Sequence, residues 1–360
     1  MDDIKYLVWL SHVFEPGTKK ITNLLDFFGK AKNVYDADFL SLKHSMILTE
    51  SDIKKISFSK KDFCIDSCIE KLFKNNISIV SKKCNNYPKL LKQTDTPPEI
   101  LYYIGELPKE NLLKISIIGS RESTQYGRLM ASRLGKELAL KNALVVSGMA
   151  RGIDSYAHQG AIDAGGKTIA VLGCGVLVCY PLENFSLYES IINNGCILSE
   201  YPPETKALPR FFPVRNRIVA GLSSATVVVE SGKKSGTSIT INYALDYGRD
   251  VFAVPGQATS AYSVGTNQLI KDGAALVTSA QDILDFLGII EPEHDFSENI
   301  QKILAPDEKL VYDLISQSPI SVDEIKANVL IDIKTIQYAL TVLEIKKIIK
   351  RLPGQKFIRA

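Results

Sequence analysis

The chain has 360 residues, 45% hydrophobic and 23% charged, a composition typical of a soluble globular protein with one large domain and one or two small ones. Its formal net charge is +3, so no strong overall field points to nucleic acid, and an anionic ligand would need a local patch. The six cysteines form no C-x-x-C pair and the four histidines are scattered, which argues against a zinc site. We therefore predict no metal and no cofactor.

The amino terminus, MDDIKYLVWL, begins with acidic residues and carries too short an apolar run for a signal peptide. No stretch approaches the roughly 18 apolar residues that a membrane-spanning helix needs. These two features predict a cytoplasmic protein without a membrane partner.

Residues 1–75 have the pattern of short helices. Apolar residues recur at helical spacing between Ile21 and Phe28, and Gly29 then ends the pattern as a C-cap glycine would. We predict a small helical module of the helix-hairpin-helix or sterile-alpha-motif type. A helical extension that packs on the next domain fits the pattern equally well.

Residues 76–288 alternate between short apolar runs and segments of helical periodicity. The expected strands are Ile115–Gly119, Ala143–Ser147, Thr168–Leu172, Cys196–Ser199, Ala225–Val229, Val251–Val254 and Ala275–Val277. The expected helices between them are Gly127–Leu140, Asp154–Ala164, Asn184–Ile192 and Ser238–Tyr247. This alternation predicts the α/β class, with an extended Rossmann-like, doubly wound parallel sheet.

The carboxyl-terminal part divides into a linker and a small domain. Residues 289–303 are acidic and polar, which is typical of a linker, and residues 304–360 show three helical segments followed by a β-hairpin. That order predicts a winged helix. Its third helical segment, Lys334–Ile345, is poor in basic residues, so we expect weak affinity for duplex DNA.

Several of the expected strand-to-helix turns carry glycine together with serine, threonine or arginine. In a parallel sheet such turns gather at the carboxyl edge of the strands, where the amino ends of helices offer free N–H groups to anionic oxygens. No Walker motif or complete dinucleotide fingerprint is present, which argues against nucleotide hydrolysis and NAD chemistry. The pattern predicts a site for a phosphate-rich ligand, with the candidate residues Gly119, Ser120, Arg121, Gly148, Arg151 and Gly152.

Two further stretches mix basic residues with aromatic or hydroxyl side chains. Rings that stack on bases, beside guanidinium groups that bind phosphates, are typical of single-stranded nucleic-acid binding. Alternatively, Phe212 belongs to the core and Arg217 pairs with Glu200 or Glu230; we expect this structural role for Arg217. The candidate binding residues are Arg210, Phe211, Phe212 and Arg215, followed by Lys233, Ser235, Gly236 and Thr237 in a second turn that suits an anion.

An Asp154–His158 pair is spaced as a catalytic couple could be. However, Asp154 is explained as a helix cap, and no nucleophile stands at a sharp turn. We therefore predict that the protein is not an enzyme.

In their order along the chain, the motifs GSRESTQYG, VVSGMARGIDSYAHQGA, VLGCGVLVCYPLEN, LPRFFPVRNRIVAGLS and VVVESGKKSGTSIT resemble the DNA-processing protein A (DprA, or Smf) family. The resemblance implies sequence-independent binding of single-stranded DNA, loading of the RecA recombinase during natural transformation, a homodimer and no catalytic activity. It implies DNA contacts for Arg121, for Phe212 or Phe211, and for Arg210, with Lys206 as a further candidate. Some members have a lysine at the position of Leu182, so that contact is not expected here.

Two other functions remain as alternatives. A nucleotide phosphoribohydrolase would share the sheet, but its P-G-G-x-G-T-x-x-E turn is replaced here by ESGKKSGTSIT. A winged-helix transcription regulator with a ligand-sensing Rossmann domain would need a more basic reading helix. The dimer surface is expected around Leu269–Leu287, where apolar residues continue beyond what one helix buries.

Overall fold

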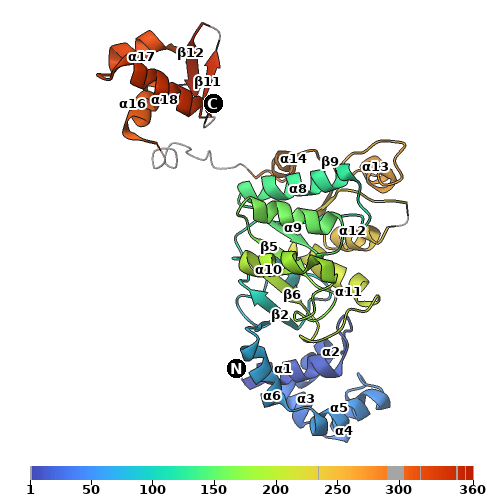
Figure 1. Cartoon of the computed structure of the whole chain (residues 1–360). Coiled ribbons are helices and arrows are strands. Elements are labelled where there is room, and N and C mark those ends of the chain that lie inside the picture. Colours follow the sequence, from blue (N-terminus) through green and yellow to red (C-terminus); the bar gives the residue numbers. More distant parts are fainter. Residues whose placement is uncertain are drawn as a thin grey trace. The chain divides into compact units, whose positions relative to one another are not determined.

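The computed structural model describes residues 2–233, 235–289, 304–316, 318–345, 348–352 and 354–359. Contacts divide the chain into two compact units, residues 1–289 and residues 290–360, which are considered separately (Figure 1). Apart from Ile289, the predicted linker 289–303 lies outside the described residues.

A nine-stranded sheet forms the centre of the first unit, in the order β1-β2-β6-β5-β4-β3-β7-β8-β9. From β6 to β9 all neighbours pair in parallel, which confirms the predicted doubly wound sheet, whereas β1 and β2 add an antiparallel edge. The strands are β1 (Ser78–Ser81), β2 (Ile100–Gly105), β3 (Lys114–Ile118), β4 (Leu144–Ser147), β5 (Thr168–Val171), β6 (Gly195–Ser199), β7 (Ala225–Val228), β8 (Asp250–Ala253) and β9 (Ala275–Leu276).

Helices cover both faces of this sheet, and alternate residues of each strand point to opposite faces. Ile115 and Ile117 of β3 join the core on one side, and Ile118 joins the core on the other. The first face is covered by α8 (Gln125–Leu140), α9 (Ile153–Asp163), α10 (Phe185–Asn193) and α14 (Ala280–Phe286). The second is covered by α7 (Lys89–Lys92), α11 (Phe211–Leu222), α12 (Thr237–Asp246) and α13 (Val264–Lys271).

Six amino-terminal helices pack on the β2 edge of the sheet and share its core. Trp9, Leu24 and Ile56 belong to one buried cluster with Tyr102 of β2, and the hydroxyl oxygens of Ser11 and Tyr102 lie 2.6 Å apart. The segment is thus an extension packed on the main domain, one of the two arrangements that its sequence allowed. Its helices are α1 (Asp2–Val13), α2 (Lys20–Phe28), α3 (Ala31–Asp36), α4 (Phe39–His44), α5 (Glu50–Asp62) and α6 (Ile65–Lys74).

The second unit has the predicted winged-helix order of three helices and a hairpin. A small separate core, which includes Val311, Ile336 and Phe357, holds these elements together. The elements are α16 (Pro306–Leu314), β10 (Ile320–Ser321), α17 (Val322–Asn328), α18 (Ile333–Ile345), β11 (Ile349–Leu352) and β12 (Lys356–Arg359). Within the described parts of both units, no helix combines the length and apolar character needed to cross a membrane.

Candidate functional site

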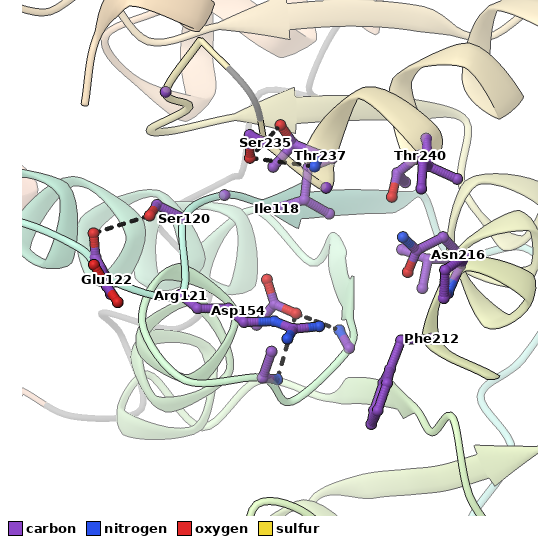
Figure 2. Close-up of a pocket in the computed structure, with 18 of the residues that line it drawn as sticks. Ile118, Ser120, Arg121, Glu122, Asp154, Phe212, Asn216, Ser235, Thr237 and Thr240 are labelled. Atoms are coloured by element: carbon purple, nitrogen blue, oxygen red, sulfur yellow. Dashed lines mark hydrogen bonds between the residues drawn. The ribbon is translucent and has the colours of Figure 1, made fainter. Parts of the chain in front are cut away.

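A cleft of about 590 Å³ opens at the carboxyl ends of β4, β3 and β7. Its walls come from residues 118–122 after β3, residues 148–154 after β4, the start of α11 and residues 232–240 around the start of α12. In Figure 2, Phe212 lies across the cleft from Ser235 and Thr237. The cleft therefore stands at the edge of the sheet where parallel α/β proteins bind ligands.

The turn from β3 into α8 is held rigidly at its base. The Ser120 amide donates to the Glu230 carbonyl over 2.8 Å, and the Thr124 hydroxyl accepts from the Gly127 amide, so Thr124 caps the amino end of α8. A Cβ on Gly152, whose φ is +74°, would lie 2.4 Å from the Ser120 carbonyl oxygen. Gly152 thus allows two strand-to-helix turns to touch, and it is not among the cleft-lining residues.

Arg121 is exposed at the end of this turn and lines the cleft. Its guanidinium carbon lies 5.4 Å from the centre of the Phe212 ring, a cation–π distance. Among the described residues no carboxylate forms an ion pair with it. Arg121 is therefore a positive group available to an anionic ligand.

Tyr180 and Tyr262 also line the cleft, and neither was predicted from the sequence. The Tyr180 ring centre lies 5.3 Å from that of Phe212, and 46% of Tyr180 is exposed. Tyr262 is 38% exposed, and its carbonyl accepts a hydrogen bond from the Ser231 amide. The sequence indicated these two residues only weakly, because a single tyrosine in a turn belongs to no periodic pattern. Tyr180 becomes a candidate through its contact with Phe212.

Arg215, one of the predicted binding residues, lies in the floor of the cleft with its side chain almost fully buried. Only 4% of the residue is exposed, and Nη1 donates to the Gly148 carbonyl over 2.8 Å and also to the Val171 carbonyl. A Cβ on Gly148 would lie 2.3 Å from that nitrogen, so glycine is needed here to make room for the guanidinium. Arg215 lends positive charge to the floor of the cleft, but its hydrogen bonds are used within the protein.

Asp154 is the carboxylate that accompanies Arg215, and its role also differs from the predicted one. Gly152, not Asp154, stands at the N-cap of α9, and the Asp154 carboxylate accepts from the Gly148 amide at 3.1 Å and the Ala150 amide at 3.4 Å. Burial raises the pKa of Asp154, while Arg215 and these amides oppose that rise. The carboxylate therefore fixes the turn after β4 from below.

His158 does not complete a catalytic couple. Its Nδ1 atom lies 2.7 Å from the Thr168 hydroxyl in the core, and burial lowers the pKa of His158 to about 3. A histidine that stays neutral and lacks access to solvent cannot exchange protons with a ligand in the cleft. Within the described residues, no group of three or more His, Cys, Asp or Glu could hold a metal ion.

Phe211, another of the predicted binding residues, is not among those that line the cleft. It is 6% exposed, and its ring centre lies 4.4 Å from that of Tyr201, so it belongs to the core. Arg210 stacks over the outer side of this ring at 4.8 Å and donates to Glu15 over 2.8 Å. Of the two adjacent phenylalanines, Phe212 is the one that reaches the cleft.

The turn between β7 and α12 forms the opposite wall. The Thr237 hydroxyl lies 2.8 Å from the Ser231 hydroxyl and donates to Ser235 over 3.0 Å. Gly236 is the N-cap of α12 and supplies no side-chain cap, so the positive end of that helix faces the cleft with hydroxyl groups around it.

The structure brings together nine of the predicted residues and leaves five outside the cleft lining. Arg151 pairs with Glu183 on the surface, and Lys233 is exposed beside the cleft. Arg217 has the expected structural role, since it pairs with Glu200 over 2.5 Å and is 4% exposed. The lining residues are Gly119, Ser120, Arg121, Gly148, Phe212, Arg215, Ser235, Gly236 and Thr237; the others are Arg151, Gly152, Arg210, Phe211 and Lys233.

Fold and cleft together define a doubly wound α/β protein with an open cleft at the carboxyl edge of its sheet, joined to a winged helix. The family model described as DNA recombination-mediator protein A matches residues 69–288, and the model of the DprA winged helix domain matches residues 298–355. The chain belongs to the DNA recombination-mediator protein A (DprA/Smf) family.

Individual relatives support this assignment. Protein Smf of Synechocystis sp. is 29% identical over 98% of both chains, and the DNA processing protein DprA of Bacillus subtilis is 42% identical over 59% of this chain and 71% of its own. Among solved structures, DprA from Streptococcus pneumoniae superposes with a TM-score of 0.68 at 33% identity, covering 78% of this chain and 97% of that one. A structure described as showing the single-stranded DNA binding mode of DprA from Helicobacter pylori has a TM-score of 0.52 at 31% identity, covering 59% and 95%.

Proposed function

We propose that this protein binds single-stranded DNA, without sequence preference, in the cleft at the carboxyl ends of β4, β3 and β7. One observation carries the proposal: the guanidinium of Arg121, which forms no ion pair with a described residue, stands over the ring of Phe212 in a cleft that the amino end of α12 also lines. A cation and a helix end suit phosphate oxygens, and the aromatic face suits any base. The single-stranded DNA binding described for the Helicobacter pylori relative supports the same function.

Within the DNA-processing role of the family, the finer proposal is that the bound strand is handed to the RecA recombinase in natural transformation and homologous recombination. The protein acts as a homodimer in the cytoplasm and holds the strand without changing it chemically. The burial of His158 supports a binding role, because a buried, neutral imidazole cannot work with Asp154 as an acid–base couple on a ligand in the cleft.

Fluorescence anisotropy of a labelled oligo-dT strand, compared with a duplex of the same length over a salt series, tests the binding function. We expect tight binding to the single strand and a steep loss of affinity with salt, because bound phosphates release counterions. Preference for the duplex would contradict the proposal and move the function to the winged helix.

The handover needs a separate assay. RecA ATPase activity should rise when this protein is added to single-stranded DNA coated with single-strand-binding protein. No stimulation, in conditions where the anisotropy shows binding, would leave a strand-binding protein that does not load RecA.

For the homodimer, we propose that the interface lies within residues 269–287. Leu269 packs against the core, so a charge there would disturb folding. Leu276 on the edge strand β9 is 51% exposed and Phe286 is 58% exposed, which makes them the better probes. Sedimentation of Leu276→Glu and Phe286→Glu variants should show monomers; intact dimers in both would place the interface elsewhere.

A further inference from the structure

A second cavity of about 550 Å³ lies beside the cleft, over the carboxyl ends of β3, β7 and β8. Its lining comes from the first residues of α8, from Glu230 after β7, and from the segment 255–263 after β8. Because β3 and β7 also carry the cleft, the two cavities are neighbours along one edge of the sheet.

Two chain segments each contribute residues to both cavities and so form the wall between them. Residues 120–122 and 261–262 line the cleft, whereas residues 124–126, 260 and 263 line the second cavity. Hydrogen bonds from the Ser231 amide to the Tyr262 carbonyl, at 2.9 Å, and from the Gly265 amide to the Ser231 carbonyl, at 2.7 Å, hold this wall. A ligand that crosses Tyr262 can therefore occupy both cavities.

The chemistry of the second cavity differs from that of the cleft. Its lining contains no lysine or arginine, and its one carboxylate, Glu230, accepts hydrogen bonds from the amide and the hydroxyl of Thr124, at 2.9 and 2.5 Å. A phosphate placed there would face this carboxylate with no cation in the lining to balance it. The cavity therefore favours a neutral ligand group.

An aromatic ring and two side-chain amides also line the second cavity. Tyr126 is 44% exposed, and its hydroxyl donates to the Pro255 carbonyl over 2.8 Å, which fixes the ring at the cavity edge. Gln125 and Gln257 contribute amides that both donate and accept hydrogen bonds, so they can serve the edge of any base. Stacking on an aromatic ring is likewise tolerant of sequence.

We infer that the second cavity is a nucleobase subsite for the strand whose backbone lies in the cleft, with Tyr126 as its stacking platform. The inference rests on the proposed single-stranded DNA binding and adds where the strand goes: from Arg121 over the wall at Tyr262 to Tyr126. The backbone stays on the cationic side, and a base enters the charge-poor side.

The test compares an oligo-dT strand with a strand of equal length that has the same backbone but no bases. Tyr126→Ala should weaken binding of oligo-dT about tenfold and leave binding of the abasic strand unchanged. Tyr126→Phe keeps the ring without its hydroxyl and should bind like the wild type. Leu129→Ala, at a 66% exposed position on the same helix and outside the cavity lining, is the matched control and should change neither affinity.

The outcomes separate this inference from the function on which it rests. Arg121→Ala should weaken both strands alike, because it removes a backbone contact. If the wild type binds oligo-dT but Tyr126→Ala weakens neither strand, or both equally, the base subsite is wrong while the cleft stands. If the wild type binds neither strand, both the proposed function and the base subsite are wrong.

Cross-linking of the wild type provides a measurement that needs no variant to fold. A strand substituted with 5-iododeoxyuridine is irradiated in the complex, and the adducts are mapped by mass spectrometry of tryptic peptides. We expect an adduct on Tyr126, in the peptide of residues 122–128. Adducts confined to Tyr180 and Phe212 would overturn the subsite.

Discussion

The surface of the cleft and the layer directly beneath it use the same residue types for opposite purposes. Arg121 and Phe212 line the open cleft, whereas Arg215 and Phe211 are 4% and 6% exposed and are held by partners inside the protein. Phe211 and Phe212 are even adjacent in sequence. The comparison teaches that a basic and aromatic composition does not by itself identify ligand contacts; the partners of each side chain do.

The buried layer also explains how the surface layer is kept in position. Arg215 bonds to the Gly148 carbonyl, and Asp154 accepts from the Gly148 amide, so the turn after β4 is clamped from both sides of one peptide unit. Changes in this layer should therefore alter stability first, and changes at the surface should alter binding with little effect on stability.

The largest expected effect is that of Arg215→Ala. The substitution removes the buried guanidinium with its hydrogen bonds to the Gly148 and Val171 carbonyls, and it takes away the positive charge near the buried Asp154 carboxyl, which should lower the free energy of unfolding by about 3–5 kcal/mol. Urea unfolding measures it, with Arg121→Ala as the matched control, for which a change within about 0.5 kcal/mol is expected. Equal stability of the two variants would remove the distinction between the layers.

The adjacent phenylalanines provide a second pair. Phe211→Ala should cost about 3 kcal/mol of stability because a buried ring leaves a cavity. Phe212→Ala should cost less stability but weaken binding of oligo-dT about tenfold, since a stacking surface is lost. Urea unfolding and anisotropy on both variants check the pair; weaker DNA binding by a folded Phe211→Ala protein and normal binding by Phe212→Ala would reverse our assignment.

Lowering the pH should lower the free energy of unfolding through the buried side chain of His158. Burial lowers the pKa of His158 to about 3, whereas an imidazole in the unfolded chain titrates near 6.5. Between these values the unfolded state binds more protons, so the free energy of unfolding falls as the pH falls below about 6.5, by about 2 kcal/mol at pH 5. Urea unfolding of His158→Asn, which has no titrating group there, should show a shallower decline between pH 7 and 5. Parallel declines would contradict this role.

Arg121→Ala is the corresponding test of the surface layer. Loss of one charged contact should lower the affinity for single-stranded DNA about tenfold for every sequence alike. The slope of log affinity against log salt should become shallower by roughly 0.7, the value for one phosphate of a single strand. Anisotropy over a salt series measures both quantities. An unchanged slope would show that Arg121 does not bind a phosphate.

The sequence was sufficient for the parallel strands because each is a short local apolar run, and β3 and β4 are followed directly by a glycine. It also placed Arg121 correctly, since the residue directly follows β3. It was insufficient for the Arg–Phe stretch because helix α11 was not predicted there. Once the helix is known, Phe211, Arg215, Ile218 and Leu222 recur at intervals of three or four residues on its buried face.

Other features depended on distant parts of the chain. The second cavity forms where residues 124–126 meet residues 255–263, and the contact of Tyr180 with Phe212 joins two separate turns. The residue pattern within one segment contains no information about its contact with a distant segment. These contacts become visible once the sheet order places the carboxyl ends of β3, β7 and β8 side by side.

Removal of the winged helix should have the smallest effect on single-strand binding. Its helix α18 carries one basic residue, Lys334, and the acidic Glu344. The exposed basic residues Lys350, Arg351 and Lys356 lie on the wing. Basic groups on a wing suit weak contacts to a phosphate backbone more than reading of base edges. A chain that ends at Ile289 retains the cleft and its own core. Measured by anisotropy, this shortened chain should have the same affinity for oligo-dT as the full chain. Residues 304–360 alone should bind duplex DNA weakly. Tight duplex binding by residues 304–360 would make that segment, and not the cleft, the main DNA-binding part of the chain.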